Sequence, residues 1–506
     1  MRFMFLLMAM VVASPAAFAQ RSIGFAETAS ADHAVIVAMR DAQLPEAVTS
    51  VIGAATTANI ERAIERTGFE GGAGATASFI SGAERFGEIH LLGIGAEEMV
   101  RRDWEDFGGR AAGMAKSSKA DGVAIFAPDA SSNNLRDAAM GAMLGQYSFD
   151  VYKSDAAPAT GDLVFVTSNA AAVSAQFDNG ERHLADAVIW TRNMQSEPPN
   201  NLYPEEFVRR ARAGFQGASN VSISVLDERA MNRLGMGALL GVGQGSVRPP
   251  RMMIARYNGG EAGEAPIVYA GKGITFDTGG ISIKPNSGMW MMKADMTGAA
   301  AVMGAVMSLA KSRAPVNVIA VAALAENMPD GGAQRPGDVV RTMSGKTVEI
   351  MSTDAEGRLV LSDAIWYAQE QYNPSLLVDV ATLTGSVGRA LGDEYGGLFA
   401  RDDAIATRVK EAAKNANEDV WRLPLHPNHD KQIKSVIADV KNADTGAPGA
   451  STGAAFIGTF VKEETPWAHL DIAGVDWRSE AEPTRPLGAS GYSVRLLDQL
   501  ARDSAQ

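Results

Sequence analysis

Residues 267–284 read IVYAGKGITFDTGGISIK, and this stretch decides the predicted fold. It opens with an apolar run typical of a buried strand, Ile267–Ala270, and continues into a glycine-rich segment that carries Lys272, Asp277 and Lys284. We expect Lys272 and Asp277 to lie at or just beyond the carboxyl end of that strand. Ligands bind at this edge in open α/β sheets. The stretch therefore predicts a strand that leads directly into a polar site.

The rest of the second half of the chain alternates strand and helix patterns, as an α/β domain does. The strand candidates share a short apolar run: Val221–Val225, Met252–Tyr257, Val316–Ala323, Leu376–Ala381 and Ala468–Ile472. The helix candidates share apolar residues at helical spacing: Ala299–Lys311, Ala355–Gln371 and Ile405–Asn415. We expect a large α/β domain with a central mixed sheet.

The first half of the chain shows the same alternation of strand and helix patterns, over fewer elements. Its candidates alternate strand and helix: Ile89–Leu92, Trp104–Lys116, Val123–Phe126, Leu135–Gln146 and Leu163–Val166. The turn signal Asp178-Asn179-Gly180 closes this half, and Pro198-Pro199-Asn200-Asn201 breaks the helical pattern that follows. We expect two domains, a smaller N-terminal α/β domain over residues 20–180 and a catalytic domain over 202–506. A connecting helix and linker over 181–201 would join them.

The first nineteen residues have the pattern of an export signal. A positive start, Met1-Arg2, precedes the apolar run Phe3–Ala13 and the small-x-small triplet Ala17-Phe18-Ala19. The run is shorter than the roughly 20 residues that a membrane span needs. A retained anchor or a buried first helix is the alternative. We expect a signal peptide over 1–19, cleavage after Ala19, and a periplasmic or secreted protein.

Charge and cysteine content exclude several classes of function. The net charge of -13 disfavours a nucleic-acid surface and binding to anionic membranes. The absence of cysteine excludes disulfides, thiolate ligands and a cysteine nucleophile. Any metal site in this chain must therefore use oxygen and nitrogen ligands.

A second glycine-rich stretch carries charged residues in the segment STDAEGRL, residues 352–359. Asp354, Glu356 and Arg358 alternate there at a spacing of two, as side chains do along one edge of an extended segment. A further carboxylate, Asp295, just precedes the small-residue helix predicted from about Gly298.

These carboxylates are the candidate ligands of a metal pair. Acidic groups brought together in apolar surroundings repel one another and lose hydration, unless a countercharge is present. Two divalent cations about 3.5–4 Å apart would supply that charge and activate a water molecule. Oxygen ligands suit Zn, Mn, Mg or Co, and an amine ligand such as Lys272 favours Zn, Mn or Co. Spacing alone does not bring the segments together, so surface turns and helix caps remain the alternative.

The same segments resemble the leucyl aminopeptidase family of dinuclear zinc exopeptidases. The resemblance rests on Asp354-Ala-Glu-Gly-Arg-Leu, on the Lys272-x4-Asp277-x6-Lys284 spacing and on Asp295. Further segments match in order: Gly241-Val-Gly-Gln-Gly-Ser, Pro249-Pro250-Arg251, Ala325-Glu-Asn-Met-Pro, Arg335-Pro-Gly-Asp-Val, Ala381-Thr-Leu-Thr-Gly and Trp467-Ala-His-Leu-Asp-Ile-Ala. It covers about Asn200 to the C-terminus, whereas the first half is similar only in length and α/β character.

The resemblance implies a role for each matching metal ligand. Asp277 and Glu356 would bridge two divalent ions, Zn or Mn. Asp354 would complete the more exchangeable site, and Lys272 with Asp295 the tighter one. Lys272 must then be neutral, which requires its pKa to fall far below the usual value of about 10.4.

The resemblance also implies the catalytic groups. Lys284 would stay protonated and polarise the scissile carbonyl. Arg358 would hold a bicarbonate ion as general base, because a guanidinium does not give up its own proton.

The implied activity is release of N-terminal amino acids from peptides by attack of metal-activated water. The side-chain pocket of the substrate would be formed by Met292 and the turn Thr382-Leu383-Thr384-Gly385, whose apolar lining favours Leu or Met. A homohexamer is also implied. Ser352 and Thr278 depart from the usual Asn and Ser, which bears on rate and selectivity. A non-catalytic or DNA-binding relative that keeps the fold is the alternative function.

Overall fold

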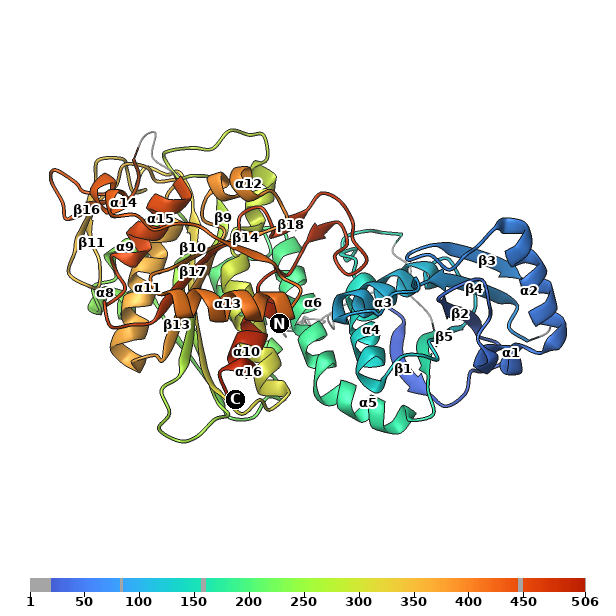
Figure 1. Ribbon diagram of the computed structural model, residues 1–506. Helices are drawn as coiled ribbons and strands as arrows, with labels where there is room; N and C mark the ends of the chain where they lie inside the picture. Colours follow the sequence, from blue (N-terminus) through green and yellow to red (C-terminus); the bar gives the residue numbers. More distant parts are fainter. Residues whose placement is uncertain (1–19, 82–84, 156–160, 445–448, 506) are drawn as a thin grey trace, which may run out of the picture. The chain divides into compact units, whose positions relative to one another are not determined.

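The structure is a computed structural model that describes residues 20–81, 85–155, 161–444 and 449–505. The predicted signal peptide, residues 1–19, lies outside these described residues. The chain divides into two units after Ser174, within helix α5 (Ala170–Asn179) (Figure 1). Both units alternate strands and helices, which confirms the predicted two-domain α/β fold. Within the described ranges, no helix has both the length and the apolar character needed to cross a membrane.

The N-terminal unit is built on a six-stranded sheet in the order β1-β6-β5-β2-β4-β3. Neighbouring strands run parallel, except that β3 is antiparallel to β4. The strands are β1 (Ser22–Ala26), β2 (Ala34–Met39), β3 (Thr76–Ile80), β4 (Glu88–Gly93), β5 (Gly122–Phe126) and β6 (Asp162–Val166). The helices are α1 (Glu46–Ile52), α2 (Ala54–Thr67), α3 (Arg101–Ala115) and α4 (Ser132–Gly145). Strand β2 is buried along its whole length, and its uninterrupted apolar run gives no periodicity that would distinguish a strand from a buried helix.

The C-terminal unit contains an eight-stranded mixed sheet in the order β15-β14-β17-β13-β9-β10-β8-β7. Its centre, β17-β13-β9-β10, is parallel, and the flanking pairs β14/β17, β10/β8 and β8/β7 are antiparallel. The strands are β7 (Val221–Leu226), β8 (Arg251–Asn258), β9 (Ile267–Asp277), β10 (Asn317–Asn327), β13 (Leu376–Ala381), β14 (Gly396–Ala400), β15 (Val420–Arg422) and β17 (Trp467–Asp471).

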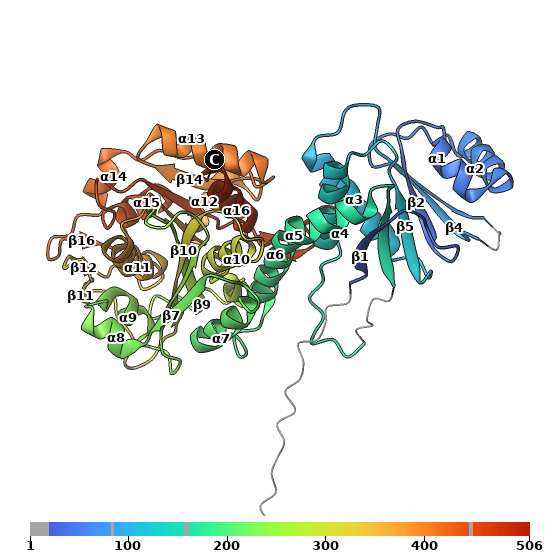
Figure 2. The same ribbon diagram turned by 90° about the horizontal axis from the view of Figure 1, so that it is seen from below.

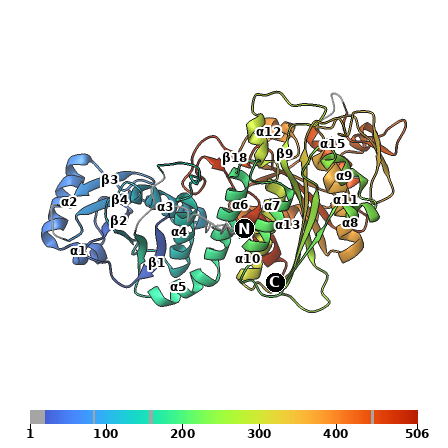
Figure 3. The ribbon, with the colours of Figure 1, turned by 180° about the vertical axis from the view of Figure 1, so that it is seen from behind.

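Helices cover both faces of this sheet (Figures 2 and 3). One face packs against α6 (Glu181–Ser196), α7 (Pro204–Gly214), α10 (Thr297–Lys311), α13 (Asp403–Asn415) and α16 (Val494–Asp503). The other packs against α8 (Glu228–Arg233), α9 (Gly237–Gly243), α11 (Gly357–Tyr372) and α15 (Gly449–Gly458). Shorter elements are η1 (Met289–Ala294), α12 (Gly385–Leu391), α14 (Pro427–Gln432) and the strands β11 (Val339–Arg341), β12 (Thr347–Glu349), β16 (Val440–Lys441), β18 (Trp477–Arg478) and β19 (Gly488–Ala489).

Strand β9 shows why residues 267–284 organise this unit. Ile267 and Tyr269 belong to the hydrophobic core on the α10 side, and Val268 and Ala270 to the core on the α11 side. Successive side chains of a strand point to opposite faces. In a central strand covered on both faces, consecutive residues such as Ile267–Ala270 are therefore all apolar. The strand is thereby fixed between two cores, and its carboxyl end is held in place.

Candidate metal centre

The candidate site lies at the carboxyl ends of the central parallel strands. Asp277 is the last residue of β9, while Lys272 lies inside that strand and not beyond it. Asp295 directly follows the short helix η1 and lies two residues before the start of α10. Asp354 and Glu356 come from the turn that leads into α11. Segments far apart in the sequence therefore meet at the sheet edge where α/β proteins bind ligands.

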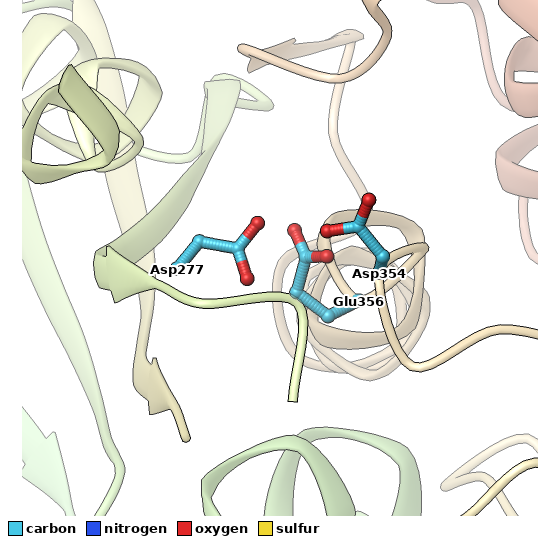
Figure 4. A group of neighbouring side chains, drawn as sticks. All are labelled: Asp277, Asp354 and Glu356. Carbon is cyan, nitrogen blue, oxygen red and sulfur yellow. The ribbon is translucent and has the colours of Figure 1, made fainter. Parts of the chain in front are cut away.

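Three carboxylates converge at this edge. One oxygen from each of Asp277, Asp354 and Glu356 lies within 4.8 Å of the other two. Figure 4 shows the three carboxylates turned toward one another, with Asp277 at the end of β9 and the other two beside the start of α11. Asp277 and Glu356 are buried, and Asp354 is exposed. This is a group of oxygen donors with the geometry to hold a cation.

The expected extended geometry of residues 354–358 is wrong. Asp354 lies in a turn, Glu356 is the residue that precedes α11, and Arg358 is already within the helix. The two carboxylates come together because the chain turns between them, not because they share one edge of a strand.

Lys272 and Asp295 extend the group on its buried side. The Lys272 ammonium donates to Asp295 Oδ1 at 2.7 Å and to the carbonyl of Thr382 at 2.8 Å, and it lies 2.8 Å from Glu356 Oε1. Thr382 Oγ1 donates to the same Asp295 oxygen at 2.7 Å. The second oxygens, Asp295 Oδ2 and Glu356 Oε2, are buried without a hydrogen-bond partner. Two buried acceptors thus remain available to a ligand.

Lys284 lies on the open side of the group. Its ammonium is 2.8 Å from Asp277 Oδ2 and 2.5 Å from Asp354 Oδ1. The lysine comes back to this position because residues 278–284 form a tight loop, in which the Lys284 amide donates to the Thr278 carbonyl at 2.8 Å. Gly279 has a φ of +85°, and a Cβ there would lie 2.9 Å from Asp354 Oδ1, so the loop requires glycine at that position.

The charges of this group shift one another's pKa. Burial and the neighbouring Glu356 raise the pKa of Asp277 to about 6, and burial raises the pKa of Asp295 well above its usual range. Burial disfavours the charged form of Lys272, but Asp295 and Glu356 outweigh it and raise its pKa. The pKa of Lys284 is raised in the same way, by Asp277 above all. Without a metal, both lysines are cationic and neutralise part of the acidic group.

Two asparagines that the sequence analysis gave no role hold the carboxylates in position. Asn327, at the end of β10, donates to Asp277 Oδ1 at 2.7 Å and to the Thr353 carbonyl at 3.0 Å. Asn442 donates to the carbonyl of Ser352 and accepts from the amide of Met351, which braces the turn before Glu356. Asn327 ends a long and mostly apolar strand, which is a usable signal in the sequence. Asn442 lies about ninety residues away along the chain and has no local signal.

Arg358 occupies a separate position. It is buried, its Nη1 donates to the Asn442 carbonyl at 2.7 Å, and its Nε has no hydrogen-bond partner. Burial lowers the pKa of Arg358, against the opposing influence of Glu356 and Asp471. A buried guanidinium N–H without an acceptor is a place where an anion would be stabilised.

A cavity of about 400 Å³ adjoins the group. All predicted site residues except Arg358 contribute to its walls: Lys272, Asp277, Lys284, Met292, Asp295, Asp354, Glu356, Thr382, Leu383, Thr384 and Gly385. The predicted pocket turn 382–385 is held by Asp471, which accepts from the Leu383 amide at 3.0 Å and from Thr384 Oγ1 at 2.6 Å. The structure therefore brings the acidic group and the predicted side-chain pocket into one cavity.

Solved structures of two enzymes are similar to this chain. The bottromycin maturation enzyme BotP in complex with Mn has 32% sequence identity and a TM-score of 0.82, covering 94% of this chain and 100% of that one. A mutant of tomato leucine aminopeptidase has 29% identity and a TM-score of 0.84, covering 97% of this chain and 98% of that one.

Curated relatives are similar over nearly the whole chain. The protein named "Probable cytosol aminopeptidase" of Rhodopseudomonas palustris (strain BisA53) is 44% identical, over 95% of this chain and 97% of its own length. The protein of the same name from Agrobacterium fabrum (strain C58 / ATCC 33970) is 43% identical, over 96% of this chain and 99% of its own length.

These names contradict the predicted export of the chain to the periplasm or beyond. The relatives are named as cytosol proteins, whereas the prediction of a signal peptide over residues 1–19 rested on local composition alone. An apolar run followed by small residues is a pattern that Ala- and Met-rich segments also produce without any role in export. The prediction of an exported protein is therefore wrong.

Family models match both units of the chain. Residues 34–156 match the N-terminal domain of the cytosol aminopeptidase family, and residues 189–498 match its catalytic domain. The resemblance stated for the second half is confirmed, and it extends to the first half, where sequence patterns alone did not show it. The chain belongs to the cytosol aminopeptidase family, whose members are metal-dependent hydrolases of the leucyl aminopeptidase type.

Proposed function

We propose that this chain releases N-terminal amino acids from peptides with the help of two divalent metal ions. Asp277 and Glu356 would bridge the ions, Asp354 would complete one site, and Lys272 with Asp295 the other. The observation that carries the proposal is the convergence of three carboxylates within 4.8 Å, at the end of a buried strand and beside a cavity.

The charge of the group supports two cations. When all are ionised, the four carboxylates and two ammonium groups would leave two negative charges in excess, in a largely buried region. Uncompensated buried charge is costly. The unpartnered oxygens Asp295 Oδ2 and Glu356 Oε2 offer two more donors. Oxygen donors with one amine fit Zn or Mn, and the similar BotP structure contains Mn.

Binding of the ions would change the roles of the two lysines. In the structure, Asp295 and Glu356 keep Lys272 cationic. Lys272 would have to be neutral to bind a metal ion, and the positive charge of nearby cations would favour that neutral form. The Lys284 ammonium lies between Asp277 and Asp354, where it would release part of its ion pairs once cations neutralise those carboxylates.

The ions would supply Lewis acidity and lower the pKa of a bound water molecule. Lys284, released toward the cavity, would donate to the carbonyl oxygen of the scissile peptide and stabilise negative charge there. Arg358 would hold a bicarbonate ion through its unpartnered Nε, and that ion would supply a general base. Met292 and the turn 382–385 would enclose the side chain of the N-terminal residue, with Leu or Met fitting the apolar wall.

Other properties follow from the family. The names of the relatives support a cytosolic location. A homohexamer is proposed on the family resemblance alone, and sedimentation of the purified chain tests it. The net charge of -13 gives the DNA-binding alternative no support.

Hydrolysis of leucine p-nitroanilide tests the proposed function. The purified protein should release p-nitroaniline, lose this activity after treatment with a chelator, and regain it with Mn or Zn. A peptide substrate blocked at its N-terminus should not be cleaved. Activity that persists without metal, or no activity with either metal, would refute the proposal.

A further inference from the structure

The cavity beside the acidic group contains one carboxylate that the proposed mechanism does not use. Asp476 lies in the loop after β17 and contributes to the cavity wall. It is separate in the chain from every proposed metal ligand. Its neighbours in that wall include Met291, Met292, Ala473 and Trp477, whose surfaces are mostly apolar.

The position of Asp476 is fixed by its backbone. Its amide donates to the Ile472 carbonyl at 3.2 Å, and its carbonyl accepts from Gln195 Nε2 and from the Ser490 amide, each at 3.0 Å. Its side chain accepts one hydrogen bond, from the Gly474 amide to Oδ1 at 3.2 Å. Among the residues that the structure describes, no side chain forms a hydrogen bond or an ion pair with this carboxylate.

A carboxylate in such surroundings is only partly compensated by positive charge, because burial outweighs the favourable effect of the Lys272 ammonium. Burial raises the pKa of Asp476 to about 6, which shows that its ionised form is poorly compensated in the free protein. A cation that enters the cavity would compensate the Asp476 carboxylate for the hydration that it loses there. The apolar neighbours would at the same time cover the alkyl part of a long side chain.

The sheet separates the strand that precedes Asp476 from the strand that ends at Asp277. Asp277 ends β9, whereas the loop that carries Asp476 follows β17, and β13 lies between these two strands. Neighbouring strands are about 4.8 Å apart, so the ends of β9 and β17 are roughly 10 Å apart along the edge. The turn 382–385, which follows β13, contributes to the wall of the same cavity. A substrate whose scissile bond lies at the acidic group would have to extend a long side chain to reach Asp476.

We infer that Asp476 selects a cationic side chain, that of lysine or arginine, in the N-terminal residue of the peptide substrate. The inference rests on the proposed function, and it names a substrate class that the apolar wall alone does not predict. Met292 and Leu383 would contact the alkyl stem of the side chain, and Asp476 would pair with its charged end. Leucine and methionine would leave the carboxylate without a partner.

Lysine and norleucine test this directly, because their side chains differ chiefly in the terminal ammonium. We compare kcat/KM for lysine and norleucine p-nitroanilide with the metal-loaded protein. For the unmodified protein, the ratio of kcat/KM for the lysine substrate to that for the norleucine substrate should be at least one. In Asp476→Asn it should fall by at least about 30-fold, the usual effect of removing one partner of a buried charge pair. Asp476→Glu keeps the charge and should keep a ratio above that of the Asn variant. Glu480→Gln, which removes an exposed carboxylate nearby, should leave the ratio unchanged.

Two results would overturn the inference. One is a preference of the unmodified protein for norleucine by more than about 10-fold, and the other is a ratio in Asp476→Asn within about 3-fold of the unmodified protein. If neither substrate is hydrolysed, the proposed function fails, but the pocket can still be tested by calorimetric binding of free lysine and norleucine. Tighter binding of lysine that is lost in Asp476→Asn supports the inference, and equal binding of the two amino acids overturns it.

Discussion

Two kinds of buried acid occur in the C-terminal unit, and their partners differ. Asp277, Asp295 and Glu356 face lysine ammonium groups, and two of them keep an oxygen without a hydrogen bond. Asp363 and Glu418 accept from backbone amides instead, although Arg495 also favours the charged form of Glu418. Asp363 accepts from the Leu239 and Met343 amides, and Glu418 accepts from the Ser493 and Leu496 amides.

The difference separates acids that hold the fold together from acids that are available to a ligand. Backbone amides satisfy a carboxylate at a fixed position and join segments that are distant in the chain. Lysines neutralise a carboxylate without using all of its acceptors, so the charge can pass to a metal ion. Burial is common to both kinds of acid, so it does not identify the site. Lysine partners, together with acceptor oxygens that lack a hydrogen bond, do.

The largest expected effect is that of Glu356→Gln. The amide keeps the size of the side chain but removes a charge that is proposed to bridge both ions. We expect at least about a 1000-fold loss of kcat/KM and fewer than two metal ions per chain, measured by mass spectrometry of the metals. Glu464→Gln, at an exposed position, serves as the control. Full activity of Glu356→Gln would show that this acid is not one of those available to a ligand.

Lys284→Ala should separate catalysis from metal binding. The lysine is proposed to stabilise negative charge on the substrate, and removal of one such donor costs about 100- to 1000-fold in kcat. Metal content should be unchanged, because Lys284 is not a ligand. The exposed Lys434, changed to Ala, provides the control. A Lys284→Ala protein that loses its metal would show that the lysine has been assigned the wrong role.

Asp363→Asn should affect stability and not chemistry. Each oxygen of Asp363 accepts from a different amide, so the NH2 group of Asn would face an N–H donor and leave it unsatisfied. We expect a loss of about 1–3 kcal/mol in the free energy of unfolding, measured with denaturant, and kcat within about 3-fold. Asp227→Asn, at an exposed helix N-cap, should cost only a few tenths of a kcal/mol. A large loss of kcat in folded Asp363→Asn would show that this acid takes part in the chemistry and does not only stabilise the fold.

The effect expected at Glu418 is of similar size and appears only as a dependence on pH. Burial outweighs Arg495 and raises the pKa of Glu418 to about 7, whereas the unfolded value is about 4.3. Because folding favours the protonated form, the stability from this group is fully present below about pH 4 and is lost as pH rises toward about 7. Glu418→Gln has no such titration.

The Tm of the unmodified protein, relative to that of Glu418→Gln, should therefore fall between pH 5 and pH 8. The change corresponds to roughly 1–3 kcal/mol. A constant difference in Tm across this range would contradict the raised pKa.

The sequence predicted the central architecture where local pattern determines it. The predicted strand Leu376–Ala381 has the same bounds as β13, because a buried parallel strand is an uninterrupted apolar run. The strand that begins at Ile267 continues seven residues beyond the predicted end at Ala270, to Asp277. Gly271 and Gly273 obscured it, since glycine weakens strand propensity. At Gly271 the backbone of α10 approaches so closely that a Cβ would lie 2.4 Å from the Gly298 carbonyl.

The site was predicted less completely than the fold. The acids could be named from their motifs, but their meeting depends on contacts between segments far apart in the chain. Asn442 braces the turn before Glu356 from about ninety residues away, and nothing in its own neighbourhood indicates this. Asp476 likewise has no sequence signal, since its importance arises only from the cavity that it enters.

The number and position of metal ions test the central claim most directly. Crystals of the active protein, measured at the absorption edge of the bound metal, should give two anomalous peaks per chain. One peak should lie against Asp354 and one against Asp295, with Asp277 and Glu356 touching both. A fully active protein with a single ion, or with ions away from these carboxylates, would contradict the account.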